Sequence, residues 1–167
     1  QMIDGCALHR QGAGVAVVCL PAFADTVRSW HPLVSALSDR CEVVVVELPG
    51  LSRPGRLPGR PTVTDIANLT AGIVRRVWAT PVTLVGHSLG SAVAVRAAQQ
   101  LDGQCHAIVS IEGNLTAHDA FLTGQAASHD DPAEFKASLA AQIDTLVAAG
   151  EAPASFAESV RAADAAT

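Results

Sequence analysis

The five residues Gly86-His87-Ser88-Leu89-Gly90 have the spacing of a serine held on a tight turn between a strand and a helix. An apolar run, 82–85, comes directly before them, and a helical pattern follows from residue 91. Gly86 and Gly90 lack bulk at the two offsets where the chain crosses itself. A serine so placed lies at a helix N-terminus, where N–H groups and the helix dipole stabilise developing negative charge. The pattern predicts a nucleophilic Ser88, against the alternative of an ordinary Gly-Ser turn.

The elements that must position this turn are visible as alternating Val-rich runs and helical patterns. Continuous apolar runs predict parallel strands, buried on both faces and joined by crossover helices, over 15–20, 42–48, 82–85 and 107–111, with an edge strand at 6–10. Apolar residues three and four apart predict helices over 29–37, 64–78 and 91–101. The second has Thr62 or Thr64 as its N-cap. Alanine-rich segments predict two further helices over 132–149 and 154–163, with no strand after them.

Together the turn and its surroundings resemble the α/β-hydrolase family, in its serine hydrolase branch, over residues 13 to about 112. The segment Leu20-Pro21-Ala22-Phe23-Ala24 lies where the family has its oxyanion-hole loop, although Pro21-Ala22 replaces the usual His-Gly. Glu47-Leu48-Pro49-Gly50 resembles the Asp-Leu-Pro-Gly that commonly ends the next strand. The resemblance implies an α/β fold, a mostly parallel sheet with helices on both faces. It also implies that the N–H groups of Phe23 and Leu89 form the oxyanion hole.

The family resemblance divides the chain into an N-terminal core, 1–112, and an incomplete helical cap or lid, 113–167, with the C-terminal part of the fold absent. The charge changes near the same point, because residues 1–111 hold nine arginines and seven acids, whereas residues 112–167 hold two bases and nine acids. Serine rather than aspartate at the turn favours acyl transfer over the dehalogenase and epoxide-hydrolase branches. An ester, thioester or amide carbonyl is therefore the expected small-molecule substrate.

The remaining catalytic groups should follow in the order serine, acid, histidine. Glu112 directly follows the strand 107–111 and is the candidate acid, with a turn or rim role as the alternative. His118 and His129 are the only histidines downstream of it, and both lie before the alanine-rich helices, where the family does not place its base. The general base is therefore unassigned. No histidine or cysteine spacing predicts a metal, and no cofactor is expected.

Composition restricts the partners and the compartment. The net charge of -5 argues against nucleic acid or an anionic membrane as a partner. No apolar run approaches the roughly 20 residues of a membrane span, and residues 1–4 do not resemble a secretory signal. The four cysteines show no C-x-x-C pattern and are expected to be buried, reduced thiols. A cytoplasmic protein is predicted.

Two alternatives to a complete serine hydrolase remain open at this stage, because no convincing histidine base is present. One is a noncatalytic hydrolase-like domain that binds a ligand or partner. The other is an enzyme whose fold is completed by a missing C-terminal half or a second chain. On either reading, the 167 residues are expected to be catalytically incomplete by themselves.

Overall fold

A computed structural model describes residues 1–49, 51–52, 57, 61–113, 115–116, 119 and 129–162. Its strands are β1 (Met2–Ile3), β2 (Cys6–Gln11), β3 (Ala16–Leu20), β4 (Glu42–Glu47), β5 (Val82–His87) and β6 (Cys105–Ile111). Its helices are η1 (Val27–Trp30), α1 (His31–Leu37), α2 (Val63–Val77), α3 (Leu89–Ala98), α5 (Pro132–Ala148) and α6 (Ala154–Ala162).

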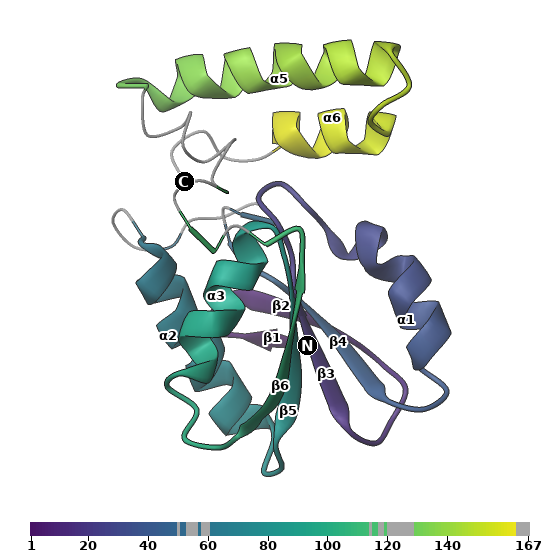
Figure 1. The fold of residues 1–167 in the computed structure, drawn as a ribbon, viewed down its shortest axis with the longest axis vertical. Coiled ribbons are helices and arrows are strands. Elements are labelled where there is room, and N and C mark those ends of the chain that lie inside the picture. The colour runs from purple at the N-terminus through teal and green to yellow at the C-terminus, as the bar shows by residue number, and fades with distance from the viewer. Residues whose placement is uncertain are drawn as a thin grey trace.

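The strands form one mostly parallel sheet in the order β1-β2-β4-β3-β5-β6 (Figure 1). The pairs β4–β3, β3–β5 and β5–β6 are parallel, whereas β2 is antiparallel to both β1 and β4. Leu20 at the end of β3 pairs with Gly86, and His87 pairs with Ile111 at the end of β6. The carboxyl ends of β3, β5 and β6 therefore meet at one edge of the sheet. The Ser88 turn, which follows β5, lies between the ends of β3 and β6.

The sheet is covered by helices on both faces because successive strand residues point in opposite directions. Val18 and Val44 belong to the apolar cluster under α2 and α3. Their neighbours Val17 and Val43 belong to the cluster under α1, together with Trp30. Figure 1 shows α2 and α3 on one side of the sheet and α1 on the other. A continuous valine run thus supplies core residues to two layers at once, as the sequence predicts.

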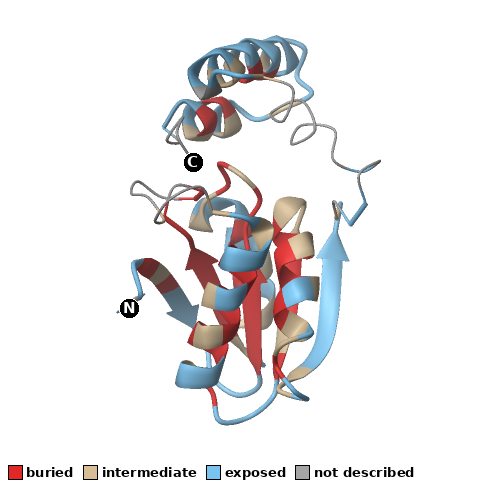
Figure 2. Cartoon of the chain, turned by 90° about the vertical axis from the view of Figure 1, so that its left-hand side faces the viewer, coloured by how far each residue is buried: buried red, intermediate tan, exposed pale blue. Residues whose placement is uncertain are grey.

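The strand β6 differs from the prediction that all the main strands are buried on both faces. Figure 2 shows β6 as an exposed strand. Its apolar residues Ile108, Val109 and Ile111 are 40%, 46% and 38% exposed. The prediction is wrong here because, among the described residues, β6 stands at the edge of the sheet and pairs with β5 alone. An apolar run indicates that a strand is suited to burial. Whether neighbouring elements cover that strand depends on its place in the strand order.

The starts of α2 and α3 are defined in different ways, α2 by a capping box and α3 by the Ser88 turn. At α2 the Thr62 side chain accepts a hydrogen bond from the Asp65 N–H, and the Asp65 carboxylate accepts one from the Thr62 N–H. This capping box makes Thr62 the N-cap. Helix α3 begins at Leu89, two residues earlier than predicted, because the chain enters the helix directly from Ser88.

Helices α5 and α6 lie over the carboxyl edge of the parallel strands (Figures 1 and 2). They pack on each other through Leu139, Ile143, Ala157 and Val160, and Ala24 of the loop after β3 belongs to the same cluster. Among the described residues, no helix combines the length and apolar character needed to cross a bilayer. The predicted division at residues 112 and 113 into core and cap stays a prediction.

Candidate active site

The turn from β5 into α3 holds Ser88 in a backbone conformation that side chains rarely adopt. Ser88 has φ of 50° and ψ of −116° and is the N-cap of α3, with no side-chain capping hydrogen bond. Such a conformation costs of order 1–3 kcal/mol in a residue other than glycine and persists only where the surrounding structure imposes it.

The glycines on either side of Ser88 make this turn possible. A Cβ on Gly86 would lie 2.4 Å from the Gly90 carbonyl oxygen, and a Cβ on Gly90 would lie 2.0 Å from the Leu20 carbonyl oxygen. The first turn of α3 therefore lies directly against the backbone of β5 and the end of β3. This contact brings the loop that follows β3 next to the Ser88 turn.

Two hydrogen bonds fix the backbone on either side of Ser88 in place. The Ser88 N–H donates to the Ile111 carbonyl of β6 at 2.9 Å. The hydroxyl of Ser91, which is fully buried, donates to the Gly86 carbonyl at 2.7 Å. A side chain on Gly113 would collide with Ser110 and Ser91, so the chain after β6 also packs tightly against the base of the turn.

The loop after β3 places Phe23 between the core and the helix pair α5–α6, because its side chain packs against both apolar clusters. Ala24 has φ of 59°, and its N–H donates to the Leu51 carbonyl at 2.8 Å. Neither the Phe23 N–H nor the Leu89 N–H has a backbone acceptor among the described residues. For Leu89 this is expected, since the first N–H groups of a helix have no partner within it.

His87, the last residue of β5, lies between two carboxylates. Its Nδ1 is 3.4 Å from Oδ2 of Asp25, and its Nε2 is 3.7 Å from Oε2 of Glu112. The Asp25 side chain is 9% exposed, whereas that of Glu112 is 85% exposed. The hydrogen bond with Asp25 raises the pKa of His87 above its ordinary value. Burial opposes this shift, and the charges of Asp25 and Glu112 reinforce it.

The Asp25 carboxylate is held ionised despite its burial. Burial raises the pKa of Asp25, but hydrogen bonds with His87, Ser29 and the Thr26 N–H outweigh it, so the net pKa is lowered. Asp25 is therefore a buried anion in the loop after β3.

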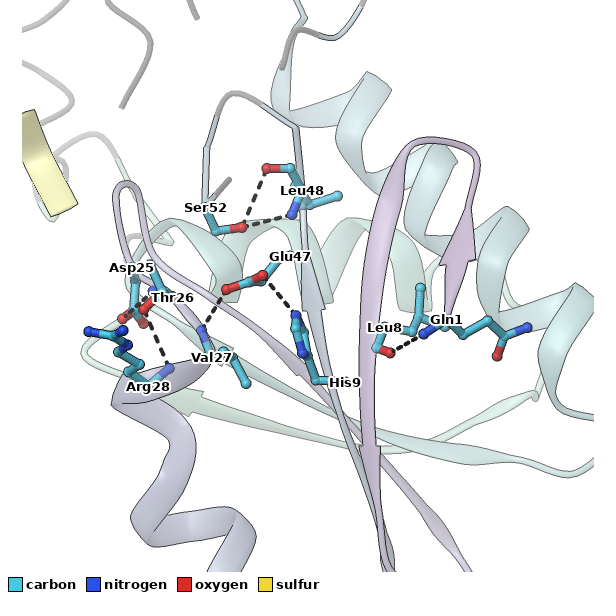
Figure 3. A network of polar contacts seen from close by, with 10 residues as sticks. All are labelled: Gln1, Leu8, His9, Asp25, Thr26, Val27, Arg28, Glu47, Leu48 and Ser52. Carbon is cyan, nitrogen blue, oxygen red and sulfur yellow. Dashed lines mark hydrogen bonds and ion pairs between the residues drawn. The ribbon is translucent and has the colours of Figure 1, made fainter. Parts of the chain in front are cut away.

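A second buried carboxylate organises the same loop from the other side. Glu47, at the end of β4, accepts a hydrogen bond from the Val27 N–H at 2.8 Å and lies 2.8 Å from Nε2 of His9 (Figure 3). Thr26 caps η1 by accepting from the Arg28 N–H. Glu47 thus anchors the start of η1, which explains structurally why an acid ends β4.

The sequence matches a known family over most of its length. Residues 17–167 fit the model of the Alpha/beta hydrolase family. The chain belongs to the alpha/beta hydrolase family.

Individual hydrolases resemble the chain more distantly. Hydrolase YugF of Bacillus subtilis, described as uncharacterized, is 30% identical over 95 residues, which cover 55% of this chain and 34% of the relative. A putative carbamate hydrolase, RutD of Azorhizobium caulinodans, is 23% identical over 66% of this chain and 42% of its own. A hydrolase of Pseudomonas aeruginosa PA01 has the same fold, with a TM-score of 0.75, 17% identity, and coverage of 96% of this chain and 64% of that one. The chain thus spans less than half of the two curated relatives.

The structure of this alpha/beta hydrolase chain brings the predicted residues His87 and Glu112 together but assigns no base. Glu112 directly follows β6, as predicted, and the histidine that it faces is His87. His118 lies outside the described residues, and His129 precedes α5, where its ring is 5.5 Å from that of Phe135. Glu112 as the catalytic acid stays a prediction. Within the described ranges no cluster of three or more His, Cys, Asp or Glu residues could hold a metal.

Sequence reasoning missed Asp25. A signal for it existed, because Asp25 follows β3 by five residues and His87 ends the adjacent parallel strand. However, the order of β3 and β5 in the sheet is needed to read that signal, and the local pattern does not contain it.

Proposed function

We propose that this chain carries the nucleophile and the oxyanion-binding groups of a serine hydrolase that acts on an ester, thioester or related acyl substrate. The observation that carries the proposal is the conformation of Ser88, with φ of 50° and ψ of −116°, between buried β5 and the start of α3. In that position the hydroxyl lies at the positive end of a helix, where negative charge that develops on a substrate is stabilised.

The proposed reaction has two steps. The Ser88 Oγ attacks the acyl carbon while a general base takes its proton, and the N–H groups of Phe23 and Leu89 donate to the oxyanion. Collapse of this intermediate breaks the bond to the leaving group, which receives the proton, and leaves an acyl-enzyme at Ser88. Water then attacks the acyl carbon and releases the acid, which restores the hydroxyl. The lack of backbone acceptors for both N–H groups among the described residues supports this assignment.

Helices α5 and α6 are proposed as part of the lid over the acyl group. They lie over the carboxyl edge of the sheet, and Phe23 packs against their cluster together with Phe135 and Phe156. An apolar lid adjoining the oxyanion loop would exclude water and bind an apolar acyl chain.

The general base is proposed to come from polypeptide outside these 167 residues, either a continuation of the chain or a second chain. The coverage of 34% and 42% of the two curated relatives supports this. The edge strand β6 also supports it, because exposed Ile108 and Val109 suit pairing with a further strand. The acid would be Glu112 or a residue of the same outside segment.

The cysteines support a cytoplasmic location for the enzyme. Cys6 and Cys19 are buried, Cys41 and Cys105 are half-buried, and none of the four, all of which the structure describes, forms a disulfide. Burial raises the pKa of Cys19 to about 12, so that thiol is unreactive in the native state.

A fluorophosphonate probe is expected to label the intact native protein at Ser88, with one probe adduct by intact mass and the modified residue located by peptide mapping. Labelling should disappear in Ser88→Ala and persist in Ser110→Ala. Ser110 is a suitable control because it is an exposed serine that pairs with Gly86 on the adjacent strand. Equal labelling of wild type and Ser88→Ala, or no labelling of the wild type, would refute the nucleophile and favour a noncatalytic binding domain.

A polypeptide of residues 1–167 alone is expected to hydrolyse short p-nitrophenyl esters about 10³-fold more slowly than the intact native protein, since a general base contributes roughly 10²–10⁴. The comparison is of kcat/KM, with the Ser88→Ala form of the same polypeptide as the background. Normal turnover by the 167-residue polypeptide would mean that its own residues complete the catalytic group.

A further inference from the structure

His87 joins three segments at the carboxyl edge of the sheet. It ends β5, whose neighbours are β3 on one side and β6 on the other. Asp25 belongs to the loop after β3, and Glu112 is the residue directly after β6. Because the carboxyl ends of parallel strands meet at one edge, the His87 ring faces one carboxylate from each neighbouring loop, at 3.4 and 3.7 Å.

Both nitrogens of the His87 ring can donate a hydrogen bond at the same time only when the ring is protonated. A neutral imidazole donates one N–H, whereas an imidazolium donates two, and so can serve Asp25 and Glu112 together. Within the described residues, the charged groups that act on the ring are these two carboxylates, and the first turn of α3 contributes no acid. Asp25 is the stronger partner, because it is buried and closer to the ring.

The contact with Asp25 ties the Ser88 turn to the loop that carries Phe23. His87 is adjacent to Ser88, and Asp25 is two residues after Phe23. Ala24 lies between Phe23 and Asp25, and its φ of 59° has to be imposed by the surrounding structure. Among the described residues, this stretch is held by the Ala24 N–H bond to Leu51, the Asp25 N–H bond to the Ala22 carbonyl and the contacts of the Asp25 side chain.

We propose that the His87 imidazolium is a positioning residue that clamps the Phe23 loop and the segment after β6 onto the Ser88 turn, so that the N–H groups of Phe23 and Leu89 converge on one oxyanion. This inference rests on the proposed function. It makes Glu112 part of the clamp, whether or not Glu112 is also the catalytic acid. Since oxyanion donors act on the transition state, loss of the clamp should lower kcat and leave KM nearly unchanged.

The test compares His87→Gln, Asp25→Asn and Glu112→Gln in the intact native protein, with kcat and KM for a short p-nitrophenyl ester measured across pH. The matched control is His106→Gln, because His106 is an exposed histidine at the start of β6, at the opposite end of that strand from Ile111 and Glu112. A parallel NMR titration follows the His87 ring directly in the wild type, Asp25→Asn and Glu112→Gln.

The wild type should lose kcat at high pH as His87 gives up its proton. Asp25→Asn should move this loss to lower pH, because the charge that raises the pKa of His87 is gone. Glu112→Gln should move it in the same direction by less, since that carboxylate is mostly exposed. His87→Gln should remove the high-pH limb and lower kcat at neutral pH about tenfold, less than the roughly 10²–10³ lost with an oxyanion donor itself. His106→Gln should match the wild type.

The clamp is refuted if Asp25→Asn leaves both the high-pH limb and the His87 titration unchanged, or if His87→Gln alters KM alone. An equal fall of kcat in His106→Gln would also refute it, since that would indicate a general effect of removing a histidine. Failure of the proposed function looks different. There, the fluorophosphonate probe does not label wild-type Ser88, and the catalytic role of the clamp falls with it, while the NMR titration still decides whether Asp25 holds the proton on His87.

Discussion

Replacing Ser88 by glycine should abolish acyl transfer and also give a more stable protein than replacing it by alanine. Both variants lack the hydroxyl, so both should lose at least about 10³-fold in kcat/KM toward short esters. They differ in backbone strain. Alanine keeps the Cβ and therefore the cost of φ 50° and ψ −116°, whereas glycine adopts this region freely.

The expected stability difference between the two Ser88 variants is about 1 kcal/mol in favour of glycine. Relief of about 1–3 kcal/mol of strain is partly offset by about 0.5–1 kcal/mol from the greater entropy of glycine in the unfolded chain. Urea unfolding of both variants, monitored by circular dichroism, measures the difference. A glycine variant less stable than the alanine variant would show that the turn is not strained. Undiminished hydrolysis by either variant would show that Ser88 is not the nucleophile.

Replacing Gly90 by alanine should destabilise the protein by about 3 kcal/mol and lower fluorophosphonate labelling of Ser88. The new Cβ would lie 2.0 Å from the Leu20 carbonyl oxygen and 2.8 Å from that of Pro21. Both are backbone atoms, so relief requires α3 to move away from the end of β3, and such overpacking costs about 1–3 kcal/mol or more. The same movement would carry the Phe23 loop away from Ser88, which is why labelling should fall as well.

Gly72→Ala is the matched control for Gly90→Ala. Gly72 lies within α2, and a Cβ there would meet nothing within 4 Å. Better helix propensity should make this variant more stable by about 0.5–1 kcal/mol, with unchanged labelling. Urea midpoints of the two variants against the wild type provide the measurement. If Gly90→Ala is as stable as Gly72→Ala, the close approach of α3 to β3 does not hold in solution.

The local features of the fold could be predicted from the sequence because they depend on neighbours in the chain. Runs such as 42–48 alternate between two apolar layers, and the apolar period of α2 is clear without any partner. Discrepancies of one or two residues occur where a tertiary contact defines an end, as at Leu89, where the turn at Ser88 starts α3 early.

The position of a serine with flanking glycines between a buried strand and a helix could be predicted from the sequence, since each of those requirements is local. The exposure of β6 and the contact of His87 with Asp25, 62 residues away in the chain, depend instead on the tertiary structure. Both outcomes follow from the order β3-β5-β6. Strand order results from long-range packing of the whole sheet, so residues that share a site through it have no characteristic spacing in the sequence.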